Sequence, residues 1–200
     1  MSSTARYAFL KEDVVNLIHE TCDVVSRVKK IVQDLKDFSR VDISPEWQLA
    51  DLHQGLDSTL NVVNHEIKYK AEVVKEYGEL PAVECLPSQL NQVFMNMLVN
   101  AVHAIAERGT ITLCTGTAGD EVWVEIADTG SGIAPENMKR IFDPFFTTKP
   151  VGTGTGLSLS YGIVQKHQGR IEVKSELGKG TVFRIALPIR QPHNGKDETS

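Results

Sequence analysis

The sequence predicts an α+β fold: a two-layer α/β sandwich in which a mixed sheet carries helices on one face, preceded by a long N-terminal helix. Three observations lead to this prediction. Of the 200 residues, 41% are hydrophobic and 24% are charged, the proportions of a globular domain with one core. Residues 10–40 contain no Pro or Gly and carry a helical repeat. From Asp51 onward, segments with helical and strand periods alternate.

A long helix is predicted over residues 10–40. Its seam positions recur at alternating steps of four and three, as in a heptad repeat: Val14, Ile18, Thr21, Val25, Val28, Val32 and Leu35. A surface helix of a globular domain does not require so long a repeat, so we expect this helix to pack in a helical bundle. Packing against its own domain is the alternative. Pro45 ends the run.

The remaining elements follow from periodicity. An amphipathic pattern predicts a helix over 51–66, and alternating side chains predict strands over 71–77 and 82–85. Further helical and strand-like runs follow: helix 88–107, strands 110–116, 121–128, 170–175 and 181–188, and helix 156–167. The tail 191–200 is polar, and we expect it to be disordered.

Charge and composition exclude several classes of protein. The net charge of −5 disfavours nucleic acid as a partner. The three cysteines, Cys22, Cys85 and Cys114, form no C-x-x-C pair, which favours reduced thiols in the cytoplasm over a zinc site. No apolar run reaches the roughly 18 residues that cross a bilayer, so we expect any membrane anchor of a longer parent protein to lie outside this sequence.

The helix over 88–107 carries an amide-rich polar stripe beside its apolar face. The stripe consists of Gln92, Asn96, Asn100, His103 and Glu107. A solvated face normally favours Lys and Glu, because Asn is a poor helix former. Two asparagines one turn apart therefore indicate a shared ligand, and an amide oxygen suits Mg²⁺. The alternative is an exposed polar face.

The strand over 121–128 ends in a carboxylate and a glycine turn. Asp128 shares the parity of the apolar positions and is expected to point to the buried face, where it needs a donor such as the exocyclic amine of adenine. Gly130 and Gly132 allow the backbone to approach a flat base, and Ile133 offers an apolar wall. An Asx turn starting at Asp128 is the alternative.

A second glycine-rich loop precedes the helix over 156–167. Its residues are Gly152, Thr153, Gly154, Thr155, Gly156 and Leu157. Such a loop entering a helix N-terminus presents backbone N–H groups to phosphate oxygens, although neither a Walker loop nor a dinucleotide fingerprint is present. A flexible loop is the alternative.

A phenylalanine-rich segment, 141–149, lies between the two glycine turns. Three phenylalanines in a segment with Pro144 and Pro150 are expected to form a lid that docks over ligand, with Lys149 approaching a phosphate. A fixed loop that buries its rings is the alternative.

The order and spacing of these motifs resemble the ATP-binding catalytic domain of two-component sensor histidine kinases, within the superfamily of gyrase, the Hsp90 chaperones and the mismatch-repair ATPases. Asn96 to Ala101 resembles the N box, Asp128 to Gly132 the first glycine box, and Phe142 to Phe146 the F box. Gly152 to Leu157 resembles the second glycine box, and Gly178 to Thr181 the final glycine-threonine element.

The resemblance implies Mg-ATP binding. It implies that Asn100 is the magnesium ligand with Asn96 supporting it, and these two are the expected catalytic residues. It also implies that Asp128 reads the adenine amine with Thr181 at the same edge, and that His103 contacts phosphate when protonated. Ala104 departs from relatives that place an aromatic residue beside the base.

The resemblance also implies a domain organisation. Residues 1–45 look like the second helix of the dimerisation hairpin, 46–190 form the ATP-binding domain, and 191–200 the tail. His19 is a poor candidate for the phosphoacceptor, because no Pro follows it closely and no turn signal occurs before Pro45. We therefore expect the first, histidine-bearing helix to be absent, with no acceptor histidine in this chain, and the chain to be unable to autophosphorylate alone.

The implied function is transfer of the ATP γ-phosphoryl group to a histidine of the parent kinase, for relay to an aspartate of a response-regulator receiver domain. The resemblance leaves open whether the chain forms a homodimer through its N-terminal helix. A superfamily ATPase needs a base one helical turn before the magnesium ligand, where this chain has Asn96, which cannot take a proton. Two further functions compete: a non-catalytic nucleotide-binding adaptor, and a serine kinase acting on an anti-sigma-factor partner.

Overall fold

The computed structural model describes Thr21 and residues 46–148 and 154–191. Apart from Thr21, which is helical, the predicted heptad helix lies outside the described residues, as do Pro45, Lys149, Gly152, Thr153 and the tail beyond Gln191. None of the helices in the described ranges is long and apolar enough to span a bilayer.

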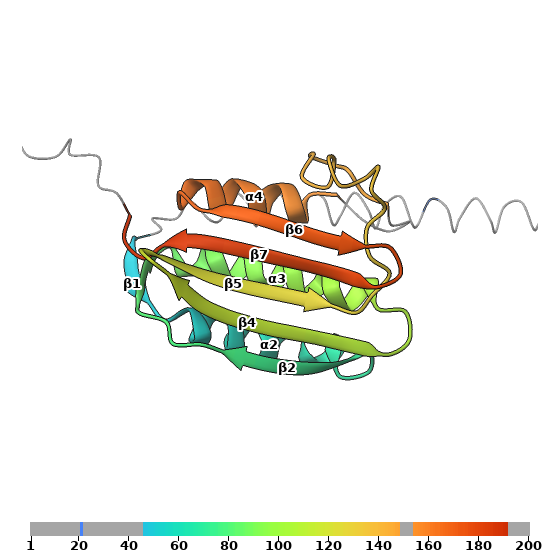
Figure 1. Ribbon diagram of the computed structural model, residues 1–200, viewed down its shortest axis with the longest axis horizontal. Coiled ribbons are helices and arrows are strands. Elements are labelled where there is room, and N and C mark those ends of the chain that lie inside the picture. Colours follow the sequence, from blue (N-terminus) through green and yellow to red (C-terminus); the bar gives the residue numbers. More distant parts are fainter. Residues whose placement is uncertain (1–20, 22–45, 149–153, 192–200) are drawn as a thin grey trace, which may run out of the picture.

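A five-stranded mixed sheet forms one layer of the domain, in the order β2-β4-β5-β7-β6 (Figure 1). The strands are β2 (Ala71–Tyr77), β4 (Gly109–Ala118), β5 (Glu121–Asp128), β6 (Arg170–Glu176) and β7 (Gly180–Pro188). Strands β2 and β4 are parallel, and the other neighbours are antiparallel.

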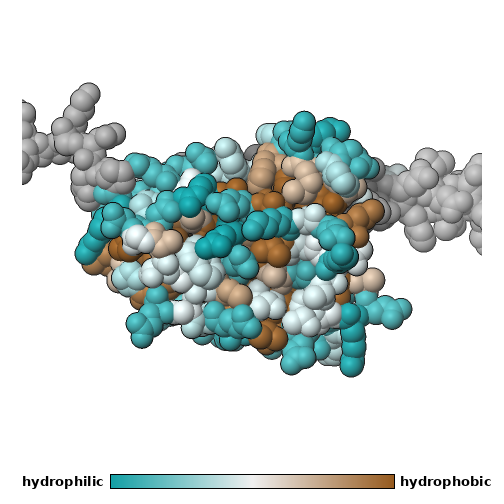
Figure 2. Space-filling view, in the orientation of Figure 1, coloured by the Kyte–Doolittle hydropathy of each residue, from teal (hydrophilic) through white to brown (hydrophobic). Residues whose placement is uncertain are grey.

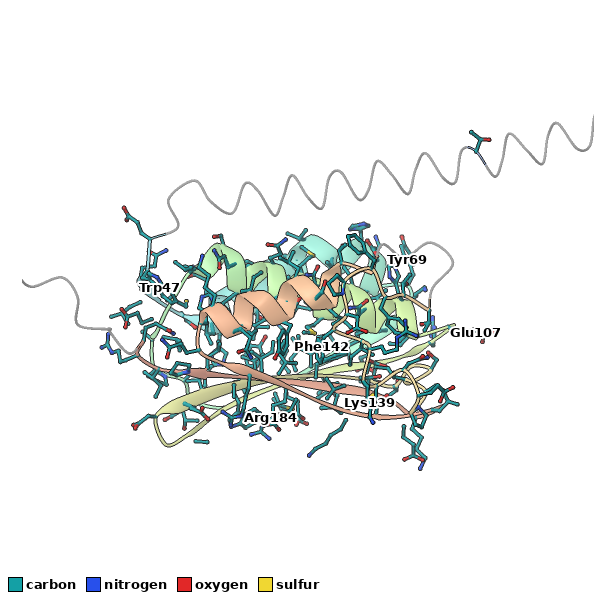
Figure 3. All side chains as sticks on the ribbon, turned by 90° about the horizontal axis from the view of Figure 1, so that it is seen from above. Trp47, Tyr69, Glu107, Lys139, Phe142 and Arg184 are labelled. Atoms are coloured by element: carbon teal, nitrogen blue, oxygen red, sulfur yellow. The ribbon has the colours of Figure 1, made fainter. Side chains whose placement is uncertain are left out.

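Three helices cover one face of this sheet, as the view from above shows (Figure 3). They are α2 (Leu52–Ile67), α3 (Pro87–Ala104) and α4 (Gly156–Lys166). Helix α3 contacts both α2 and α4, so it lies in the middle of the helical layer. The predicted two-layer α+β fold is confirmed.

The burial pattern explains why these segments form a half-covered sheet. Along β5 every second residue is buried beneath the helices, ending with Asp128. The intervening Trp123 and Glu125 lie on the other face, where Arg184 stacks 4.2 Å from the Trp123 ring. That open face is largely hydrophilic or neutral, with scattered hydrophobic residues (Figure 2). The alternation therefore places one row of side chains in the core and the other in water.

The structure differs from the sequence-based expectation in one additional strand and in the end of the central helix. A short strand, β1 (Gln48–Ala50), was not predicted, and it pairs with β3 (Val83–Cys85) in a separate two-stranded sheet. The central helix ends at Ala104, because Ile105 takes an extended conformation with φ −84° and ψ 118°. Glu107 therefore does not continue the polar stripe of α3.

The tail was predicted to be disordered from residue 191, but Gln191 is hydrogen-bonded to the domain. The backbone N–H of Gln191 donates to Glu84 Oε2 at 3.0 Å. Its side-chain amide donates to the carbonyl oxygens of Glu84, at 3.3 Å, and His167, at 3.1 Å. These bonds tie Gln191 to the end of α4 and to β3, so the ordered domain includes this residue.

A buried histidine joins α3 to α4 at the end of the domain where Trp47 lies, opposite Glu107 (Figure 3). His167 is 1% exposed, and its Nε2 accepts from the backbone N–H of Leu86 at 3.0 Å. Its Nδ1 lies 2.8 Å from the carbonyl oxygen of Ile163, which can only accept. The ring is therefore the neutral tautomer with its proton on Nδ1, and burial lowers its pKa.

Candidate functional site

Three strands bring polar side chains together at one end of the sheet, below the helices. Asp128, the last residue of β5, faces Thr181 near the start of β7. Thr181 in turn faces Ser175 on β6. Because cross-strand partners point to the same face, the three side chains form one polar row on the helix-covered side. We call Asp128, Thr181 and Ser175 the polar rung.

Asp128 is buried as predicted, with 8% of its surface exposed. Its Oδ1 accepts a hydrogen bond from the backbone N–H of Gly130 at 2.8 Å. The Asx turn, which the sequence allows as an alternative to a ligand-binding role, is therefore present. A carboxylate has two oxygens with about four acceptor positions, so this turn is compatible with a further donor from a ligand.

The first glycine turn is wedged between α3 and the β6–β7 turn. A Cβ atom on Gly130 would lie 2.6 Å from the carbonyl group of Ala104, and one on Gly132 would lie 2.2 Å from the carbonyl oxygen of Glu176. Gly132 also has φ +70°. The backbone N–H of Ser131 donates to the Ala104 carbonyl at 2.9 Å. The glycines are thus required for close backbone packing at this turn.

Within the polar rung, Ser175 connects Thr181 to the first glycine turn. Its Oγ accepts from the backbone N–H of Ile133 at 2.8 Å, donates to the carbonyl of Gly180 at 3.0 Å, and lies 3.0 Å from Thr181 Oγ1. Sequence analysis missed this residue. The available signal was a serine at an inward-facing position in a strand that otherwise alternates Ile171 and Val173 on that face.

Asn96 holds α3 against the beginning of α4. Its Nδ2 donates to the carbonyl oxygen of Gly156 at 3.0 Å and lies 3.2 Å from the Oγ of Ser160. Ser160 is fully buried and was not predicted as a site residue. Asn100, one helical turn further along α3, is half-buried on the same stripe.

His103 lies at the exposed end of the stripe. Its side chain is 42% exposed, and its Nε2 lies 3.8 Å from Glu66 Oε2 on α2. The two side chains form an ion pair only when the imidazole is protonated, which is also the form in which a phosphate contact is expected.

The second glycine loop ends at α4. The N-cap residue of this helix is Thr155, whose side chain makes no capping hydrogen bond to the first turn. The amide groups of a helix N-terminus favour an anion in general, and phosphate binding by this loop stays a prediction. Leu157 and Ile133 are partly buried against the core, so each presents an apolar side chain at the edge of the site.

The phenylalanine-rich segment is partly docked on the domain. Phe142 lies beside α4, with its ring centre 5.3 Å from that of Tyr161 (Figure 3). Phe146 packs against the core and lies under the Arg140 guanidinium at 4.5 Å. Phe145 is 65% exposed and has φ +64°. Two of the three rings therefore pack on the domain, and the third faces solvent.

The residues of this site suit a nucleotide better than a free metal ion. Within the described ranges, no three His, Cys, Asp or Glu side chains gather as a metal site. A hard cation such as Mg²⁺ would need phosphate oxygens and water to complete its shell around an amide oxygen, which is the usual way in which Mg²⁺ binds with nucleotides.

Comparisons of sequence place the chain among known proteins. A family model described as histidine kinase-, DNA gyrase B- and HSP90-like ATPase matches residues 85–191. The sensor histidine kinase ZraS of Salmonella typhi is 35% identical over 86% of this chain and 38% of its own length. The histidine-protein kinase AtoS of Escherichia coli is 39% identical over 85% of this chain and 28% of its own length. The chain thus spans less than half of these relatives.

Solved structures agree with this placement. The catalytic domain of histidine kinase ThkA superposes with a TM-score of 0.67 at 29% identity, covering 73% of this chain and 97% of that domain. Full-length ShkA in complex with AMPPNP gives a TM-score of 0.71 at 25% identity, covering 90% of this chain and 39% of that protein. The chain belongs to the histidine kinase-, DNA gyrase B- and HSP90-like ATPase family, in which it is an ATP-binding catalytic domain of the sensor histidine kinase type.

Proposed function

We propose that this domain binds Mg-ATP at the polar rung and supplies the γ-phosphoryl group to a histidine of the parent kinase. The observation that carries the proposal is the cross-strand pair of Asp128 and Thr181, buried at the sheet end beside a glycine turn. The side-chain oxygens of Asp128 and Thr181 can accept hydrogen bonds from the exocyclic amine of adenine, and the apolar side chains at the edge of the site can contact its flat ring. The complex of ShkA with AMPPNP supports a nucleotide in a fold of this kind.

The phosphates would extend from the base toward α4. Amide groups from Gly154 to Leu157 would receive their oxygens, with Lys149, Gly152 and Thr153 expected to complete the loop. Asn100 would supply an amide oxygen to Mg²⁺, which neutralises charge on the phosphates during transfer. His103 would contact a phosphate in its protonated form.

Transfer to a side chain is favoured over hydrolysis by the chemistry of Asn96. This residue occupies the position from which a superfamily ATPase activates water. An amide cannot accept a proton, and the Asn96 amide nitrogen already bonds to Gly156 and Ser160. We assign it the role of a positioning residue that fixes the second glycine loop relative to α3.

The proposed partners follow from the relatives, which are named sensor histidine kinases. The acceptor histidine of the parent kinase would receive the phosphoryl group, and the receiver domain of a response regulator would take it to an aspartate. We also propose that residues 1–45 belong to a dimerisation hairpin through which a homodimer forms, and that the domain acts in the cytoplasm.

Calorimetric titration with a non-hydrolysable ATP analogue, with and without Mg²⁺, tests the binding step. Asp128→Asn keeps an oxygen for the Gly130 amide but removes the charge, so we expect a folded variant whose affinity falls about 10- to 100-fold. Asn100→Ala should reduce the gain in affinity that Mg²⁺ gives. Saturable binding that is insensitive to Asp128→Asn would place the nucleotide elsewhere and overturn the assignment.

A further inference from the structure

We propose that Ser175 is a positioning residue that makes the base pocket select adenine over purines with a carbonyl at C6. It does so by fixing the direction of the Thr181 hydroxyl proton. The inference rests on the proposed binding of ATP at the polar rung. It adds a residue outside the nucleotide-binding motifs and a stated specificity.

The direction of the hydroxyl proton follows from a count of donors and acceptors around Ser175. A serine hydroxyl has one proton to donate and two lone pairs. The carbonyl oxygen of Gly180, 3.0 Å away, can only accept, so it takes the proton of Ser175. The backbone N–H of Ile133, 2.8 Å away, can only donate, so it uses one lone pair.

The remaining contact of Ser175 is with Thr181 Oγ1 at 3.0 Å. Because the single Ser175 proton is already directed to Gly180, only Thr181 can donate in this contact. This arrangement satisfies all three contacts at once. Thr181 is 3% exposed, so water competes little for its hydroxyl proton.

The consequence is that Thr181 presents only lone pairs to a bound base. Asp128, directly opposite on β5, likewise presents carboxylate oxygens. Adenine carries an amino group with two donors at C6, whereas hypoxanthine and guanine carry an oxygen there. Two neighbouring acceptor groups therefore accept hydrogen bonds from the amino group of adenine and repel the C6 oxygen of hypoxanthine or guanine. Without Ser175, the Thr181 hydroxyl can turn and donate to that carbonyl.

A purely structural role for Ser175 predicts a different result. Its bond to Ile133 braces the apolar wall of the pocket, and losing that brace would weaken every purine nucleotide to a similar extent. Reorientation of the Thr181 hydroxyl instead changes the ratio of the dissociation constants for nucleotides with two different bases. The ratio of dissociation constants thus separates the two roles.

The test compares ADP with inosine diphosphate, which differ in the base and carry no γ-phosphoryl group to transfer. Both dissociation constants are measured by calorimetry on the full chain, the Ser175→Ala variant, and the control Lys174→Ala at an exposed position of the same strand. We expect the wild type to prefer ADP and Ser175→Ala to reduce that preference roughly 3- to 10-fold. Lys174→Ala should leave the preference unchanged.

A double-mutant cycle with Thr181→Val completes the test. Valine keeps the branched shape but has no hydroxyl, so adding Ser175→Ala to it should change the preference less than about 2-fold. If Ser175→Ala does not fold, Ser175→Cys is measured in its place, because a thiol is a weaker acceptor of similar size.

The outcomes separate this inference from the proposed function. A wild type that binds neither nucleotide overturns ATP binding and the inference with it. A wild type that binds ADP but shows the same preference after Ser175→Ala, or equal preference for both bases at the start, overturns the inference alone. The inference is supported if Ser175→Ala reduces the preference for ADP in the wild-type background but not in the Thr181→Val background.

Discussion

The side-chain amide of Asn96 donates a hydrogen bond of 3.0 Å to the main-chain carbonyl oxygen of Gly156, the first residue of α4. This bond joins the Asn96 to Ala101 motif on the central helix α3 to the second glycine loop. A residue that the sequence indicated as a site asparagine therefore has a mechanical role. It sets the distance between the proposed magnesium ligand on α3 and the amide groups at the N-terminus of α4.

Asn96→Asp should destabilise the domain, because a carboxylate of the same shape cannot donate to the Gly156 carbonyl and repels it instead. We expect a loss of about 1–3 kcal/mol in the free energy of unfolding, measured by urea denaturation. Affinity for Mg-nucleotide should fall as well, since the second glycine loop loses its anchor. Gln92→Glu, the same change of charge about one turn earlier on α3, is the matched control and should have little effect on either quantity.

Gly132→Ala should disrupt the first glycine turn. An added Cβ would meet the carbonyl oxygen of Glu176 at 2.2 Å, and the backbone already has φ +70°. Gly119→Ala is the control, because its φ of +62° imposes a similar backbone cost while no atom lies within 4 Å of the added Cβ. We expect about 1 kcal/mol of destabilisation at Gly119 and clearly more at Gly132, together with loss of nucleotide binding. Equal effects would show that the contact with Glu176 relaxes at no cost.

Gly162→Ala should stabilise the domain. This glycine lies within α4, is exposed, and has open space where a Cβ would be added. Alanine there should raise the free energy of unfolding by about 0.5–1 kcal/mol, because it restricts the unfolded chain and favours the helix. Nucleotide affinity should be unchanged. A fall in thermal stability would indicate that α4 needs a flexible centre.

Most of the fold could be predicted because its elements are long and strongly periodic. The predicted strand over 121–128 coincides with β5, and its alternation of buried and half-buried residues is the pattern expected from sequence. Strand β1 has only three residues, from Gln48 to Ala50, which is too short for a periodic signal. The end of α3 was missed for a related reason, because helical spacing continues past Ala104 although the backbone turns at Ile105.

Candidate site residues could be proposed from sequence where the residue type itself carries the chemistry. Asp128 could be identified because a carboxylate at a buried strand position needs a partner. Ser175 and Ser160 could not, since serine is common and their roles depend on groups distant in sequence. Ser175 bonds to Ile133, 42 residues away, and Ser160 to Asn96, 64 residues away. Only the sheet register and the helix packing bring these partners together.

Stability should decrease as the pH falls below the ordinary pKa of histidine, because His167 is buried as the neutral tautomer. Burial lowers its pKa in the folded state, so the unfolded chain binds the proton more readily. The contribution is therefore fully present above about pH 6.5 and is lost as the pH falls. Each pH unit below that value should cost up to about 1.4 kcal/mol until the folded-state pKa is reached.

Urea denaturation at pH 7.5, 6.5 and 5.5 measures this effect when the wild type is compared with two variants. His167→Gln removes the titrating group, so it should be less stable at pH 7.5 but lose less stability between pH 7.5 and 5.5. His65→Gln changes a histidine whose side chain is 72% exposed, and it should retain the pH dependence of the wild type. If His167→Gln and the wild type lose equal stability on acidification, another group is responsible. The junction of α3 and α4 would then tolerate a protonated His167, with Leu86 N–H turning to another acceptor.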